Sequence, residues 1–281
     1  MSRLSKTSAI AGAIFTALIF CLQVSAQTSL PGISTEDELR SDLILAPCAS
    51  KQRAEAVSKL FQRMGAAETE ISSEKIKDVQ NIIVTKKGRV DETIIVGAHY
   101  DKTSDGCGAI DNWSGIVMVA HLYRTLRSAD TQKNYVFVAF DKEEIGLVGS
   151  ARMANSIPKE NRKSYCAMVN LDSFGFTYPQ VLTNTSNAKM TDLAKSLAAE
   201  VKMPFGSASL AGVADADSSS FLAKDIPAVT FHGLSDKWKQ YLHTSSDKVE
   251  NVNAASVRVG YNFLLAYLEK LDASPCSVFR K

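Results

Sequence analysis

Residues 94–111 read IIVGAHYDKTSDGCGAID, an apolar run that ends abruptly in His99, Tyr100 and Asp101. A short, uninterrupted apolar run of this kind is typical of a strand buried on both faces. In an open α/β sheet, ligands bind beyond the carboxyl ends of such strands. His99 and Asp101 share one face of an extended chain because they are two residues apart. With Asp111 arriving by a loop, the segment predicts a metal site, and a polar strand end without metal is the alternative.

Two further apolar runs also end in acidic side chains. Residues 134–140 (NYVFVAF) precede the pair Glu143 and Glu144, and residues 165–171 (YCAMVNL) precede Asp172. Charged residues scattered at random would not follow strand after strand in this way. We therefore expect these carboxylates to meet at one edge of the sheet, where the carboxyl ends of parallel strands lie together.

Strand and helix patterns alternate along the chain, which predicts a sheet whose centre is largely parallel. The sequence shows no internal repeat and no linker that would divide the mature chain. The predicted strands are 79–85, 93–98, 134–140, 165–171, 180–183 and 226–231. The predicted helices are 51–64, 114–126, 147–156, 188–201 and 254–271, and the first, second and last of these have an apolar stripe.

The composition is that of an ordinary globular protein. The chain has 281 residues, of which 45% are hydrophobic and 22% charged, and it is long enough for one large α/β domain, which we place at residues 48–281. With 32 basic and 30 acidic residues, the net charge is +2. This balance indicates neither nucleic acid nor an anionic membrane as a partner. It says nothing about oligomeric state.

The N-terminus is typical of a secretory signal peptide. Arg3 and Lys6 give it a positive start, an apolar run follows, and the small residues at 24–26 (VSA) offer a cleavage site. The apolar run is shorter than the roughly 18 to 20 clean apolar residues of a membrane span, which argues against a transmembrane anchor. We expect residues 1–26 to be removed on export to the periplasm or the medium, leaving residues 27–47 as a lead-in segment.

Four cysteines remain beyond this signal: Cys48, Cys107, Cys166 and Cys276. An even number of cysteines in an oxidising compartment predicts at least one disulfide. Four cysteines allow three connectivities, and their spacing selects none of them. A zinc site of the cysteine type is not indicated, because the sequence contains no C-x-x-C spacing.

The polar residues at and beyond the predicted strand ends form a set without thiolates. They are His99, Asp101, Asp111, Glu143, Glu144, Asp172 and, from a late loop, His243. Imidazoles combined with carboxylates suit zinc in a catalytic role. The set is too large for one tetrahedral ion, which predicts two ions about 3.5 to 4 Å apart that share a carboxylate and activate a water. Neighbouring side chains at a strand end diverge, so one glutamate of the pair can bind metal while the other accepts a proton.

These residues lie in motifs that resemble the zinc aminopeptidases of peptidase family M28 (aminopeptidase Y/S-like). The resemblance covers residues 79–271, and its motifs are HYD from 99, DNWSG from 111, EEIGLVGS from 143, NLD from 170 and HTSSD from 243. It implies a three-layer α/β/α sandwich of the phosphorylase/hydrolase-like type. The sheet would be mixed, mainly parallel and about eight strands wide.

The resemblance also implies a role for each residue of the set. Asp111 would bridge two zinc ions. His99 and Asp172 would complete one metal site, and Glu144 and His243 the other. Glu143 would be the general base, and Asp101 would orient His99.

The implied activity is that of a secreted zinc-dependent exopeptidase acting on peptides with a free N-terminus. Glu143 would take a proton from the attacking water and pass it to the leaving amine. One alternative is a glutaminyl-peptide cyclotransferase, which uses a single zinc on a similar fold. A second alternative is a non-catalytic binding module. Zinc content separates the three, at two, one or no ions per chain.

Two departures from the family pattern bear on specificity. Trp113 stands where a small residue is usual, and we expect it to narrow or shape the cleft. Ser218 follows Asp217 where a histidine is usual, which predicts altered specificity rather than lost chemistry. Aromatic residues from flanking loops could line an apolar pocket, and packing of the loops themselves is the alternative: Phe174, Phe176, Tyr178, Trp238 and Tyr241.

The two histidines outside the set have simpler interpretations. His121 falls on the predicted helix 114–126 and is expected to be a surface or packing residue. His232 ends the last predicted strand, near the site, and could contact substrate there.

Overall fold

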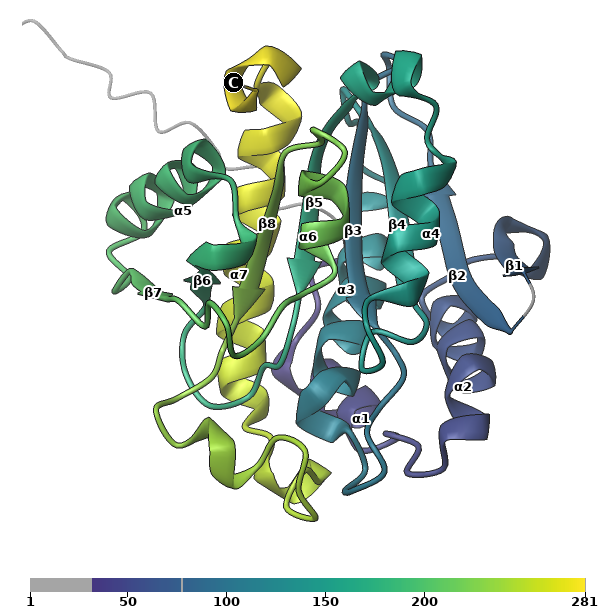
Figure 1. Cartoon of the computed structure of the whole chain (residues 1–281), viewed down its shortest axis with the longest axis vertical. Coiled ribbons are helices and arrows are strands. Elements are labelled where there is room, and N and C mark those ends of the chain that lie inside the picture. The colour runs from purple at the N-terminus through teal and green to yellow at the C-terminus, as the bar shows by residue number, and fades with distance from the viewer. Residues whose placement is uncertain (1–31, 77, 281) are drawn as a thin grey trace, which may run out of the picture.

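The computed structural model describes residues 32–76 and 78–280 (Figure 1). The expected signal peptide, residues 1–26, and the first part of the lead-in lie outside the described residues. Within the described ranges, no helix combines the length and the apolar character needed to cross a bilayer.

A single mixed sheet of eight strands forms the centre of the molecule, in the order β1-β2-β4-β3-β5-β8-β6-β7. The strands are β1 (Ile71–Ile76), β2 (Val79–Lys86), β3 (Thr93–His99), β4 (Asn134–Phe140), β5 (Tyr165–Leu171), β6 (Gln180–Leu182), β7 (Gly206–Ala208) and β8 (Ala228–His232). The four central strands, β4, β3, β5 and β8, are parallel, and β2 and β6 flank them antiparallel. The carboxyl ends of the central strands therefore meet at one edge, the lower edge in Figure 1.

Helices cover both faces of this sheet, so the predicted three-layer α/β/α sandwich is confirmed. The helices are α1 (Glu36–Leu43), α2 (Ser50–Arg63), α3 (Ser114–Leu126), α4 (Val148–Ser156), α5 (Ala188–Glu200), α6 (Ser218–Leu222) and α7 (Ala254–Ala273). Helices α4 and α6 lie on the face that is in front in Figure 1, and α3 and α7 lie behind the sheet.

The period of two along each central strand distributes its side chains between these layers. On β3, Ile94, Val96 and Ala98 enter the large core beneath α3 and α7. Ile95 enters the smaller core beneath α4 and α6. His99 has the same parity as Ile95, so the strand carries it to the α4/α6 side of the sheet.

The segment before α2 is part of this fold from residue 32 onward. Helix α1 packs against α3 and α7 and buries Leu39 and Leu43. His121, on α3, is fully buried; its Nδ1 lies 2.7 Å from Ser34 Oγ and its Nε2 lies 3.0 Å from Asp42 Oδ2. His121 therefore has the packing role that the sequence allowed, and it ties α1 to the body of the domain.

Two disulfides join segments that are distant in sequence, which confirms the prediction of at least one. Cys48–Cys107 links the start of α2 to the loop after β3 and closes 59 residues. Cys166–Cys276 links β5 to the C-terminal turn and closes 110 residues. The first of these lies beside the loop that carries Asp111.

Candidate metal centre

The set of residues proposed from the sequence comes together at the carboxyl edge of the sheet. His99 is the last residue of β3, Glu143 and Glu144 follow β4, and Asp172 follows β5. His243 reaches the same place from the loop between β8 and α7. Parallel pairing brings these strand ends together, because it aligns His99 of β3 with the last residue of β4.

Asp111 lies at the middle of the cluster and presents one oxygen to each histidine. Its Oδ1 is 3.1 Å from His99 Nε2, and its Oδ2 is 3.1 Å from His243 Nε2. Glu144 Oε2 is also 3.1 Å from His243 Nε2. Asp172 Oδ1 lies 3.8 Å from His99 Nε2. The arrangement has two halves that share the carboxylate of Asp111.

The two neighbouring glutamates lie in different halves. Glu143 Oε2 is 3.9 Å from His99 Nε2 and belongs to the half that contains Asp172. Glu144 belongs to the half that contains His243. Glu144 also has a carboxylate oxygen within 4.8 Å of a His99 ring nitrogen, so both glutamates lie near that histidine.

Asp101 lies beside a histidine and holds the backbone of the glutamate pair. Its Oδ1 lies 3.4 Å from His99 Nδ1. Its carboxylate also accepts hydrogen bonds from the backbone N–H groups of Glu143, at 3.0 Å, and Glu144, at 3.2 Å. Sequence reasoning gave Asp101 only the first of these contacts. The second explains how the loop after β4 is held against β3.

The backbone around Asp111 is irregular and is held by buried side chains. A cis peptide bond joins Asp111 to Asn112. The side-chain amide of Asn112 donates to Leu171 O at 2.8 Å, and its oxygen accepts from the backbone N–H of Ser173 at 3.1 Å. The carboxylate of Asp247 accepts from the N–H of Asp111 at 3.2 Å.

Asp247 supports the Asp111 turn, and it was not among the site residues proposed from the sequence. It is the last residue of the HTSSD motif, it is buried, and it also accepts from Ile110 N–H at 2.7 Å. Its own backbone oxygen accepts from Cys107 N–H at 2.7 Å. It thus ties the loop of His243 to the loop of Asp111. An acid four residues after a proposed ligand was the available signal.

The charges of the cluster act strongly on the histidines. Hydrogen bonds to Asp111 and Glu144 raise the pKa of His243 to about 10. Burial lowers the pKa of His99, but the surrounding carboxylates, Glu143 foremost, raise it well above its usual value. For the carboxyl group of Glu143, by contrast, burial disfavours the charged form and raises the pKa well above its usual range. A site that draws protons onto both histidines has an excess of negative charge, which a bound cation would neutralise.

The donor set fits one or two divalent cations. Two groups of three residues each place a ligand atom from every member within 4.8 Å of the others: His99 with Glu143 and Asp172, and His99 with Asp111 and Glu144. Glu144 Oε1 is buried and has no hydrogen-bond partner among the described residues. Imidazole nitrogens and carboxylate oxygens without thiolates are typical ligands of catalytic zinc.

A cavity of about 340 Å³ opens directly onto this cluster. Its apolar wall is mostly aliphatic, and the lining residues include Leu147, Leu182, Leu210, Val213, Leu234, Trp238 and Leu242. The predicted aromatic lining is therefore wrong for all but Trp238. Phe174 is fully buried in the core beneath the sheet, and Phe176 packs on Tyr241 with ring centroids 4.8 Å apart. Tyr178 does not line the cavity either.

Trp113 does not narrow the cleft, so that expectation is also wrong. Its side chain is 1% exposed and points into the core behind the metal cluster. The indole N–H donates to Asp42 O at 3.0 Å. Trp113 immediately precedes α3 and its ring packs in the core with that helix, which the sequence motif alone did not reveal.

Asp217 and Ser218, where the sequence departs from the family pattern, lie next to the cavity through Thr230, which lines it. Asp217 is fully buried, and burial raises its pKa to about 7. Ser218 is buried too; its hydroxyl donates to Thr185 O at 2.7 Å and lies 2.6 Å from Thr230 Oγ1. His232 lines the cavity, and burial lowers the pKa of its ring to about 4.

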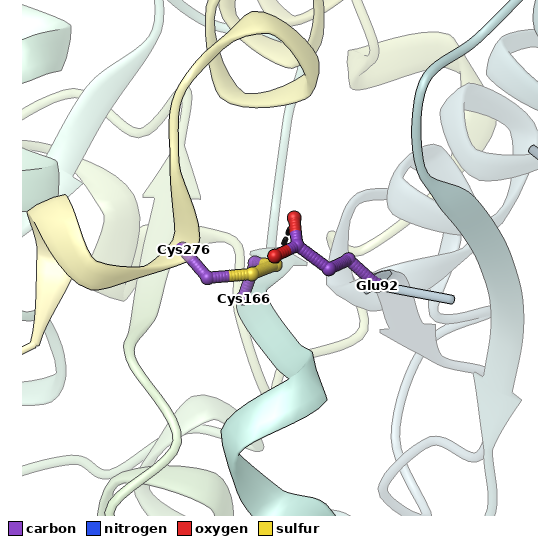
Figure 2. A group of neighbouring side chains, drawn as sticks. All are labelled: Glu92, Cys166 and Cys276. Carbon is purple, nitrogen blue, oxygen red and sulfur yellow. Dashed lines mark hydrogen bonds between the residues drawn. A yellow bond between two sulfur atoms is a disulfide. The ribbon is translucent and has the colours of Figure 1, made fainter. Parts of the chain in front are cut away.

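A separate group in the described part of the chain, one acid and two cysteines, is not a metal site with thiolate ligands. Figure 2 shows the carboxylate of Glu92 beside the Cys166–Cys276 disulfide, with Glu92 Oε2 3.6 Å from Cys166 Sγ. The two sulfurs are bonded to each other and cannot both act as metal ligands. The cluster at the carboxyl edge of the sheet therefore remains the candidate centre.

The sequence pattern of "Peptidase family M28" matches residues 81–268, more than half of the chain. The chain belongs to peptidase family M28. The matched range contains every ligand-type residue of the cluster. The M28 chain is also 28% identical over 184 residues to "Aminopeptidase YwaD" of Bacillus subtilis, an alignment that covers 62% of this chain and 40% of that protein.

Solved structures show the same fold. A zinc aminopeptidase from Bacillus subtilis, BSAP, aligns with a TM-score of 0.61 at 23% identity over 72% of this M28 chain and 53% of its own. A glutaminyl cyclase from an Acidobacteriales bacterium aligns with a TM-score of 0.74 at 16% identity, over 88% and 97%. The chain thus spans 40% of YwaD, about half of BSAP and nearly all of the cyclase.

Proposed function

We propose that this chain is a zinc-dependent exopeptidase that removes N-terminal residues from peptides. One observation carries the proposal: Asp111 presents an oxygen to each of two histidines, so two metal half-sites share one carboxylate beside Glu143. The name of its B. subtilis relative supports the aminopeptidase activity, and the zinc named for its structural neighbour supports the metal.

Each half-site has its own set of residues. His99 and Asp172 would hold one zinc ion, His243 and Glu144 the other, and Asp111 would contact both. Zinc bound there would supply Lewis acidity, polarising a carbonyl oxygen and making a water more acidic. Asp101 would hold His99 in the orientation that ligation requires, because a second hydrogen-bonding partner fixes the ring and its tautomer.

Glu143 would move the proton in the reaction. It lies in the half with His99 but is not needed to complete either set of ligands. Its backbone N–H donates to Asp101, and Glu143 lines the cavity. From there it can accept the proton of the attacking water and return it to the leaving amine.

The cavity suggests the class of substrate. Two acidic residues of its lining that would not hold zinc, Glu143 and Asp215, favour a cationic group such as a free α-ammonium. Its aliphatic wall fits an aliphatic side chain, which would be desolvated there. We therefore propose peptides with a free N-terminus and an aliphatic first residue, such as leucine.

A panel of aminoacyl reporters tests this function. Leucyl reporters should react at least about tenfold faster, in kcat/KM, than aspartyl or lysyl reporters, because the aliphatic wall cannot solvate their charges. An N-acetylated leucyl reporter is the matched control and should not react. Turnover of the acetylated substrate at the rate of the free one would refute the exopeptidase proposal.

The glutaminyl cyclase neighbour makes cyclisation the second candidate. The same preparation should be incubated with a peptide that has an N-terminal glutamine, and the masses of the products should be measured by mass spectrometry. Loss of ammonia with an intact chain, together with one zinc per chain, would favour the cyclase. Release of free amino acid with two zinc ions per chain would favour the exopeptidase.

We also propose export, on the strength of the N-terminal sequence. Cleavage after residue 26 predicts that the mature protein, isolated from the periplasm or medium, begins at Gln27. N-terminal sequencing gives the answer. An intact Met1 on a membrane-bound protein would contradict the proposal.

A further inference from the structure

A buried arginine lies behind the metal cluster and makes no ion pair. Arg53, on α2, is 0% exposed, and the described residues offer it no carboxylate within salt-bridge distance. Its N–H groups donate to main-chain carbonyls instead. Nε donates to Tyr100 O, Nη1 to Pro47 O at 3.1 Å and to Cys107 O at 2.9 Å, and Nη2 to Gly108 O at 3.2 Å. A buried charge without a charged partner is costly, so this one requires an explanation.

Three of these four carbonyls, those of Tyr100, Cys107 and Gly108, lie on or next to the segment that joins Asp101 to Asp111 of the metal centre. Tyr100 immediately precedes Asp101, and Gly108 lies three residues before Asp111. The planar guanidinium therefore binds both ends of the intervening loop, which only a rigid fork of donors can do. Gly108 has a φ of +58° and adopts the left-handed conformation there.

The other side of the guanidinium faces Trp113. The Arg53 Cζ lies 5.5 Å from the centroid of the Trp113 ring, within the range of a cation–π contact. The backbone N–H of Trp113 donates to Gly108 O at 3.0 Å, the same oxygen that accepts from Arg53. Asp111 thus lies between two residues, Gly108 and Trp113, that one guanidinium holds.

The charge and the geometry of Arg53 have opposite consequences for a bound cation. Burial lowers the pKa of Arg53 to about 10, while Asp101, Asp247, Asp111 and Glu144 raise it, so the side chain is charged at neutral pH within the field of these carboxylates. As a charge alone, Arg53 would repel a metal ion and weaken its binding. As a fork that orders the Asp111 loop, it would strengthen binding.

We propose that Arg53 and Trp113 act as a cation–π support that positions Asp111 for metal, and that positioning outweighs the repulsion. The proposal rests on the proposed zinc-binding function. The proposal explains Trp113, which does not line the cleft, because its indole ring provides the surface over which the guanidinium lies. Arg53 is a positioning residue in this view and does not touch substrate.

The test compares zinc affinity, measured by competition with a chelator, across matched variants. Arg53→Lys keeps the charge and loses the fork; we expect its zinc affinity to fall about 10- to 100-fold, as for other residues that orient ligands. Trp113→Phe is a milder change and should lower affinity in the same direction. In the double variant the two losses should not add, because the residues act as one unit.

Arg127→Lys is the control, because Arg127 lies 6.0 Å over Tyr123 in a similar contact away from the cluster. It should leave zinc affinity unchanged. Melting temperatures in excess chelator separate folding from binding for every variant. Unchanged affinity in Arg53→Lys, or tighter binding in Arg53→Met, would show that the arginine acts as a charge only and would overturn the proposal. Absence of zinc from the wild-type protein would instead overturn the proposed function.

Discussion

Replacement of Glu143 by glutamine should lower turnover by about 10² to 10⁴-fold while both zinc ions stay bound. The factor is that of general acid–base catalysis by a positioned side chain. Glutamine preserves the shape of the side chain and removes its ability to accept a proton. Because the Glu143 backbone N–H is held by Asp101, the substituted side chain should occupy the same position. The measurement is kcat on a leucyl reporter, alongside zinc per chain by elemental analysis.

Glu144→Gln is the matched control for this prediction. Glu144 Oε2 faces His243 Nε2 at 3.1 Å, so its loss should weaken the half-site to which it belongs. Added zinc should then restore part of the activity, which it cannot do for Glu143→Gln. If Glu143→Gln lost metal and Glu144→Gln kept both ions, the roles of the two residues would be reversed.

The strand ends were predictable from the sequence because periodicity and burial act locally. A short β-branched run such as 94–98 favours a buried strand, and the parallel order of the sheet then brings His99, Glu143 and Asp172 to one edge. The two halves of the cluster follow from these positions. His243 was harder to place from the residues alone, because it comes from a long irregular loop, and the resemblance of the HTSSD motif supplied it.

Sequence patterns failed where long-range packing decides the structure. Strands β1 and β7 and helix α6 were not predicted. β7 and α6 have only three and five residues, and β1 (ISSEKI) is an edge strand without an alternating apolar pattern, so each takes its stability from a neighbour. The aromatic pocket was wrong for a similar reason: Phe174 follows the Asp172 strand end, yet its ring turns back into the core.

The supports of the metal loop were also hidden from the sequence. Nothing local distinguishes Arg53 from the other basic residues of a helix whose exposed face is charged. Only the fold shows that the carbonyls of Tyr100 and Gly108 converge on it. Asp247 was visible as a motif residue, but its contacts with the Asp111 turn depend on a loop 136 residues away.

Replacement of Asp111 by asparagine should have the largest effect of any single substitution on metal content. Among the described residues, Asp111 is the one whose carboxylate oxygens lie 3.1 Å from each of the two histidines, so the change should weaken both half-sites at once. An amide keeps one oxygen and removes the negative charge. Only one of the two metal positions would then face an oxygen of residue 111, and the amide nitrogen would face the other.

We expect Asp111→Asn to bind fewer than two zinc ions per chain and to lose about 10³-fold or more in kcat/KM, because a catalytic metal contributes several kcal/mol and each 1.36 kcal/mol is tenfold in rate. Asp247→Asn is the control, since Asp247 holds the Asp111 backbone but faces no metal position. It should lower zinc affinity less and keep two ions at saturating zinc. Zinc titration followed by activity measurement distinguishes the two variants. If Asp111→Asn retained two tightly bound ions and full activity, the shared carboxylate would have no role in metal binding, and the two-ion proposal would fail with it.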